Sequence, residues 1–120
     1  QLGDGKGGTF ESTFTPVDVS GLGSGVTAIS AGTGFSTAVV SGGVKYWGAY
    51  LDGTLTPLDV QGVTADMTAV ATGADFACAL VNDGAVKCWG NNNGGQLGIY
   101  VNRDIGYHEE QTPVGVDSLP

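Results

Sequence analysis

Short apolar stretches rich in β-branched residues alternate with glycine- and serine-rich breaks along the chain. The clearest stretches lie at residues 26–31, 35–40 and 43–47, and similar ones follow at 76–81 and 86–89. Runs of this length that contain Val, Ile, Thr, Tyr and Trp between glycine breaks are typical of β-strands. No window of 11 residues carries an apolar helical stripe free of glycine. The pattern therefore predicts an all-β protein.

The stretch from Val26 to Gly48 recurs, almost residue for residue, from Met67 to Gly90, at an offset of 41 residues that grows by one at a turn. A repeat period of 40 to 50 residues is typical of stacked blades and solenoids, whose units bury their faces against their neighbours. Two further segments are duplicated. Thr-Pro-Val-Asp-Val and its variants occupy residues 15–19, 56–60 and 112–116, and Gln-Leu-Gly occupies 1–3 and 96–98.

Two turns set the register of the predicted hairpins. Residues 40–43, Val-Ser-Gly-Gly, fit a two-residue hairpin turn, and residues 81–85, Val-Asn-Asp-Gly-Ala, fit a three-residue loop with a left-handed glycine. The longer loop accounts for the extra residue in the offset while the strand register is kept. The predicted cross-strand pairs are Thr37 with Tyr46 and Cys78 with Cys88.

Five submotifs recur in a fixed order: Val-Thr-Ala-Ile, Phe-x-x-Ala-Leu, Gly-x-Val-Lys-Cys-Trp-Gly, Asn-x-x-Gly-Gln-Leu-Gly and Thr-Pro-Val-x-Val. In these motifs the chain resembles the repeat of the regulator of chromosome condensation family, in its bacterial, cysteine-containing form. The resemblance implies four-stranded antiparallel blades of a β-propeller, which in that family usually has seven blades. Two departures stand out. Residues 49–53 replace Asn-x-x-Gly-Gln-Leu-Gly in the first full repeat, and Gly34 and Asp75 replace the His that commonly precedes the second strand.

The repeats divide the chain into one propeller-repeat domain of about two and a half units. We expect residues 1–25 to be the closing half of a repeat, 26–63 a short full repeat and 64–120 a long one. So few blades cannot close the usual ring of four to eight. The ring is therefore completed either by missing repeats or by other chains, in the simplest case two or three copies of this one, because bare blade faces and edges favour association.

Composition and charge limit the partners. Only 13% of the residues are charged, about half of the usual share, and 22 of 120 are glycine, as many tight turns require. The net charge is −8, and the four cations, Lys6, Lys45, Lys87 and Arg103, are scattered along the chain. Nucleic acids and anionic membranes demand a basic patch, so we expect neither as a partner. No apolar run is long enough for a transmembrane segment.

The two cysteines, Cys78 and Cys88, are predicted to face each other on neighbouring strands, at a distance that a disulfide can bridge. We expect a disulfide, which favours an extracellular or cell-surface location. Two buried thiols in a cytoplasmic protein are the alternative. A metal site has least support, because no third cysteine exists and His108 is distant in the sequence.

No catalytic or cofactor-binding constellation is readable. Gly3 to Gly8 matches Gly-x-Gly-x-x-Gly, but no helix is expected after it, so we expect no dinucleotide and no other cofactor. The segment between Trp-Gly and Thr-Pro is much longer in the second repeat, at residues 91–111, than in the first, at 49–55. Interfaces favour aromatic residues and Arg. The candidate partner-binding residues in the longer segment are Tyr100, Arg103, Tyr107 and His108.

The alternative for this long segment is that it only covers the edge of a blade. The sequence therefore favours a non-catalytic protein-interaction or structural module, part of a secreted or surface bacterial propeller, whose partners are neighbouring repeats, itself or another protein. The second hypothesis is a self-assembling homo-oligomeric propeller that acts as a ligand-binding protein. An enzymatic role has no support from the residues.

Overall fold

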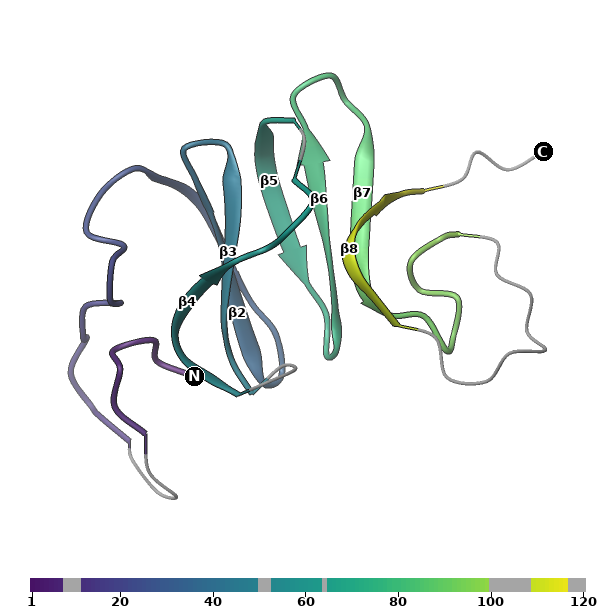
Figure 1. The fold of residues 1–120 in the computed structure, drawn as a ribbon. Helices are drawn as coiled ribbons and strands as arrows, with labels where there is room; N and C mark the ends of the chain where they lie inside the picture. The colour runs from purple at the N-terminus through teal and green to yellow at the C-terminus, as the bar shows by residue number, and fades with distance from the viewer. Residues whose placement is uncertain (8–11, 50–52, 64, 100–108, 117–120) are drawn as a thin grey trace.

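The computed structural model describes residues 1–7, 12–49, 53–63, 65–99 and 109–116. These residues form two four-stranded antiparallel sheets, which stand side by side as two blades (Figure 1). In both sheets the strand order follows the chain order. The strands of the first blade are β1 (Val26–Ala31), β2 (Phe35–Val40), β3 (Gly43–Gly48) and β4 (Thr54–Asp59). Those of the second blade are β5 (Met67–Thr72), β6 (Phe76–Val81), β7 (Val86–Asn91) and β8 (Glu109–Gly115).

The all-β propeller-blade architecture expected from the repeat is confirmed. Strands β1 to β3 match the predicted stretches to within one residue at one end. The two blades form an open arc and do not close a ring. In the part of the chain that the structure describes, no helix is long and apolar enough to cross a membrane.

The first hairpin turns through Ser41 and Gly42, as predicted. Both residues have positive φ, 50° and 81° respectively, as the two central residues of a hairpin turn of the I′ kind require. The turn brings Val40 opposite Gly43 and fixes the register of β2 on β3. Thr37 consequently pairs with Tyr46, which confirms the predicted register.

The second hairpin has the predicted longer loop. The amide of Val81 donates to the carbonyl of Ala85 at 2.8 Å, and Gly84 has a φ of 93°. This loop keeps the register of β6 on β7 and pairs Cys78 with Cys88. Their sulfur atoms are joined in a disulfide, as the sequence predicts.

The main core lies between the two blades rather than within either one. We call the side of the first blade that contacts the second its forward face; its buried residues are Phe35, Val39, Val44 and Val60. We call the side of the second blade that contacts the first its rear face; its buried residues are Met67, Ala77, Ala79, Val81 and Trp89. These nine side chains form one contiguous cluster, so each blade is stabilised mainly by its neighbour.

Close backbone approach and a few polar contacts align the blades at the end of β1 and β5. The Oγ1 atoms of Thr37 and Thr72 lie 2.7 Å apart, and the amide of Thr72 donates to Ser30 Oγ at 2.9 Å. Beyond these contacts Gly32 lies directly against Gly73. The side chain of Thr37 is completely buried, so its hydroxyl depends on this one neighbour for a hydrogen bond.

The hydrogen bond between Thr37 and Thr72 predicts that substitutions at the two positions are coupled, which packing alone does not predict. Thr37→Val is expected to lower the free energy of unfolding by about 1 kcal/mol, because Thr72 loses a partly buried partner. Thr72→Val in the same background should cost little more, since both hydroxyls are then gone. A double-mutant cycle by urea unfolding measures this coupling. Fully additive effects would contradict the hydrogen bond.

Candidate interaction site

The forward face of the second blade has no blade packed against it among the described residues, although it repeats the buried forward face of the first. Counterparts are assigned by the repeat: Leu80 corresponds to Val39, Val86 to Val44 and Val116 to Val60. The exposed fractions are 41%, 42% and 43% for Leu80, Val86 and Val116, against 0%, 2% and 7% for Val39, Val44 and Val60. The same apolar positions are thus covered in one blade and open in the other.

The disulfide lies within this open face. Cys78 and Cys88 occupy the positions of Thr37 and Tyr46 in the first blade, whose side chains are turned toward the second blade. Cys88 is buried, and the bond joins the two central strands of the blade. It therefore holds β6 and β7 in register at the centre of a surface that also exposes Leu80 and Val86.

Protein prepared without reductant and then unfolded is expected to contain no free thiol, because Cys78 and Cys88 are bonded. Reduction opens a closed loop with a sequence separation of 10, which should lower the free energy of unfolding by about 2 to 3 kcal/mol by freeing the unfolded chain. Thiol titration in denaturant and urea unfolding with and without reductant measure the two effects. Two titratable thiols in unreduced protein would contradict the bond.

The rear face of the first blade is only partly covered. The segment from Val17 to Leu22 runs along it and leaves an apolar hollow of about 340 Å³, which also involves Val26, Ile29 and Trp47. Ile29 is 75% exposed there, whereas its counterpart Val70 packs against the core between the blades. The molecule therefore presents two incomplete faces, one at each end of the pair of blades.

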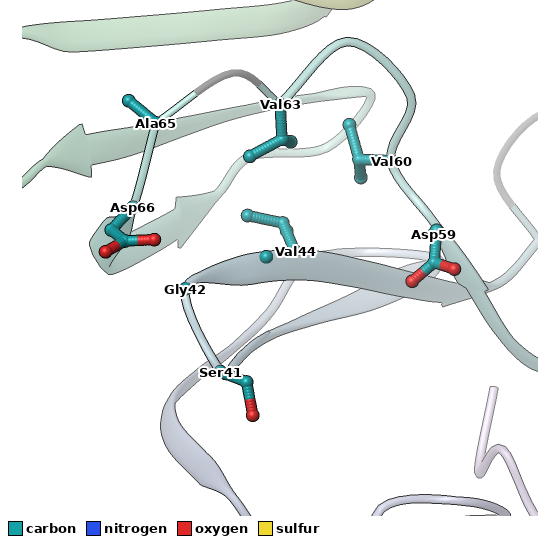
Figure 2. A pocket seen from close by; sticks show the side chains of 9 residues that line it. Ser41, Gly42, Val44, Asp59, Val60, Val63, Ala65 and Asp66 are labelled. Atoms are coloured by element: carbon teal, nitrogen blue, oxygen red, sulfur yellow. The ribbon is translucent and has the colours of Figure 1, made fainter.

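A second hollow, of about 430 Å³, lies between the first blade and the segment that leads to β5, beside the turn of the first hairpin (Figure 2). Figure 2 shows Val44, Val60 and Val63 turned toward its middle, with Asp59 and Asp66 at separate places on the rim. Lys45 Nζ lies 2.8 Å from Asp59 Oδ1, so one of the two carboxylates already has a cation. No group of three or more His, Cys, Asp or Glu side chains that could hold a metal ion occurs among the described residues.

The four candidate loop residues, Tyr100, Arg103, Tyr107 and His108, lie outside the described residues. The beginning of their segment is described, and polar contacts brace it. Asn91 Nδ2 donates to Asp75 Oδ2 at 2.7 Å, and the amide of Leu97 donates to the buried Asn92 Oδ1 at 3.0 Å. The roles of Asp75 and Asn92 were not predicted, although Asn92 is the first residue of the Asn-x-x-Gly-Gln-Leu-Gly motif.

Comparisons with known proteins agree with this architecture. Residues 67–96 match the sequence profile described as the Regulator of chromosome condensation (RCC1) repeat. A comparison with curated proteins by sequence gives no match. The profile covers the second blade through β7 and the start of the long segment, which is the part of the chain that carries the cysteines.

Two proteins with solved structures are similar to the chain in fold. Human WBSCR16 aligns with a TM-score of 0.69 and 20% identity over 88% of this chain and 31% of its own. Yeast RCC1 (Prp20), from the crystal structure with Kap60, aligns with a TM-score of 0.65 and 18% identity over 78% of this chain and 25% of its own. The chain spans about a quarter to a third of these structures. These structures share the fold of the chain, and the profile match over residues 67–96 agrees with the resemblance of the sequence motifs to this repeat.

Proposed function

We propose that this chain is a non-catalytic protein-interaction module built of RCC1-like propeller repeats, and that the forward face of its second blade is its main docking surface. The observation that carries the proposal is the difference in exposure between Leu80, Val86 and Val116 and their buried counterparts in the first blade. Contiguous exposed apolar surface on a soluble protein marks an interaction site. In the first blade the equivalent face is covered by protein, namely by the second blade.

We further propose the repeat boundaries 1–25, 26–63 and 64–120, and a place for the chain in a secreted or surface bacterial propeller. The disulfide supports this location, because such bonds persist in oxidising compartments. A solved structure of yeast Prp20p, similar in fold at a TM-score of 0.63 and 16% identity over 78% of this chain and 26% of its own, is described with binding properties to Gsp1p and histones. Tyr100, Arg103, Tyr107 and His108 remain the proposed partner-binding residues of the long segment, because interfaces favour aromatic residues and Arg.

Self-assembly is the second candidate, with the chain acting as a ligand-binding homo-oligomer. The observation that favours it is that the molecule has both halves of a blade interface: an open forward face on the second blade and an incompletely covered rear face on the first. A heterologous contact between such faces generates either a closed ring or a filament.

A matched pair of substitutions tests the docking surface. Leu80→Asp places a charge on the forward face of the second blade, whereas Leu58→Asp places the same charge on β4 of the first blade, at a site equally exposed, 44% against 41%. Sedimentation velocity at micromolar concentration is expected to show association of the unmodified chain and of Leu58→Asp, and its loss in Leu80→Asp, because a buried unpaired charge is costly. Equal association of the two variants would contradict the proposal.

A further inference from the structure

The N-terminal segment is folded as if it closed a blade, although no strand occurs in residues 12–25. A Cβ atom on Gly3 would lie 2.8 Å from Val19 Cγ1, and one on Gly98 would lie 2.8 Å from Val116 Cγ1. Gly3 and Gly98 both end a Gln-Leu-Gly motif, and Val19 and Val116 both end a Thr-Pro-Val-x-Val motif. The amide of Ser20 also donates to the carbonyl of Gly3 at 2.8 Å. The segment thus reproduces a contact of the second blade.

Among the described residues of this segment, Gly3 lies against the rear face of the first blade and Gly5 is hydrogen-bonded to β4. A Cβ atom on Gly3 would lie 2.8 Å from Trp47 Nε1, so the glycine lies flat against the indole ring. The amide of Gly5 donates to the carbonyl of Leu55 at 3.1 Å. Because residues 12–25 take part in no sheet, moving them away would break no strand pairing.

The hollow beside the N-terminal segment lies on a blade face that is only partly covered, and it can be compared with the interface between the two blades. In the interface between the two blades, Trp89 and Met67 belong to one buried cluster with Phe35, Val39, Val44 and Val60 of the first blade. On the rear face of the first blade Val19 already stands where the counterpart of Val60 belongs, next to Trp47. What would complete this face are counterparts of the other three residues, which in a blade are carried by its second and third strands.

The second blade displays those counterparts. Its residues Phe76, Leu80 and Val86 correspond to Phe35, Val39 and Val44, and Leu80 and Val86 are exposed. Val116, the counterpart of Val60, is also exposed. It occupies the same place in the Thr-Pro-Val-x-Val motif as Val19. The second blade of another copy and the N-terminal segment therefore carry the same Thr-Pro-Val-x-Val strand, and only one of the two can lie beside Trp47.

We propose that the rear face of the first blade is a docking site for the second blade of another copy of this chain, and that residues 12–19 act as a plug which the incoming blade displaces. The inference rests on the proposed function, since it uses the same forward face, and adds the acceptor site and the competing segment. The plug yields because it has no strand partners, whereas β8 of the incoming blade is paired with β7. Association is accordingly weakened, not strengthened, by the seated N-terminal segment.

Three variants test this, with folding checked by circular dichroism and association by sedimentation velocity across the micromolar range. Ile29→Asp blocks the acceptor face and Leu80→Asp blocks the docking face; both residues are exposed, so the monomer keeps its fold. Each variant alone is expected to be monomeric, with a dissociation constant raised more than about a hundredfold. Their mixture retains one intact face of each kind and is expected to form a one-to-one dimer.

Gly3→Val tests the plug. At a φ of 77° and against the Trp47 ring, a valine cannot be accommodated, so the segment is expected to leave the face. The dissociation constant for self-association should fall by about tenfold or more. Leu58→Asp serves as the control and should behave as the unmodified chain.

The outcomes separate the two proposals. If Leu80→Asp abolishes association but Ile29→Asp does not, the forward face docks protein elsewhere and the acceptor site is wrong, while the proposed function stands. If the chain associates and neither substitution matters, both proposals fall. If both the unmodified chain and Gly3→Val are monomeric throughout, self-docking and the plug are wrong, while docking of a different protein on the forward face stands. Weaker association in Gly3→Val would show that the segment belongs to the docking surface, which overturns its role as a plug.

Discussion

Gly32→Ala is expected to lower the free energy of unfolding by about 3 kcal/mol, the upper end of the usual cost of overpacking. A Cβ atom at this position would collide with the carbonyl oxygen of Gly73 and lie 2.8 Å from Thr72 Cγ2. Because the carbonyl belongs to the backbone of the second blade, no rotamer change relieves the collision. The blades would have to separate at the point where Thr72 bonds to Ser30 and Thr37.

Gly23→Ala is the matched control for this substitution. A Cβ atom at Gly23 would meet nothing within 4 Å, so its effect should stay within about 0.5 kcal/mol. Urea unfolding of the two variants, followed by circular dichroism, gives the comparison. Similar midpoints for Gly32→Ala and Gly23→Ala would mean that the blades do not approach as closely as the structure has them.

The second large effect is expected for Trp89→Ala, at about 3 to 5 kcal/mol. Trp89 is 2% exposed and belongs to the cluster that joins the blades, so its removal leaves a cavity that both blades border. Since small domains are stable by only about 5 to 15 kcal/mol, the variant should be close to unfolding at ambient temperature.

Phe14→Ala controls for the loss of a large aromatic side chain. Phe14 is fully exposed, and its removal should leave the unfolding midpoint unchanged within error. Thermal and urea unfolding of both variants provide the measurement, and Val44→Ala, expected to cost about 2 kcal/mol, gives a milder second test should Trp89→Ala not fold. A small effect of Trp89→Ala would contradict the placement of the main core between the blades.

Local features of the fold could be predicted because short-range rules determine them. The lengths of the two turns fix the pairing of Thr37 with Tyr46 and of Cys78 with Cys88, and glycine at the turn positions supplies the positive φ that these turns need. The repeat offset then transfers the register from one blade to the next. None of this requires knowledge of what the blades contact.

Properties that depend on neighbours could not be read from the same motifs. Residues 15–19 have nearly the sequence of the fourth strands, β4 and β8, yet form no strand, because no third strand of the described residues lies beside them to pair with. Val39 and Leu80 belong to the same motif, but only the first has a blade packed against it. A motif gives a residue its place in a blade, whereas burial, and with it the candidate site, depends on whether the next blade is present.

The central claim is that the forward face is covered in the first blade and open in the second. Its most direct test places a negative charge at Val39 or at its counterpart Leu80. Thermal melts of Val39→Asp and Leu80→Asp are to be compared by circular dichroism at the lowest concentration that gives a signal, where association contributes least. We predict that Val39→Asp is unfolded at ambient temperature, because the charge is buried between the blades, and that Leu80→Asp melts within a few degrees of the unmodified chain. Comparable destabilisation by both substitutions would contradict the account of one covered and one open forward face.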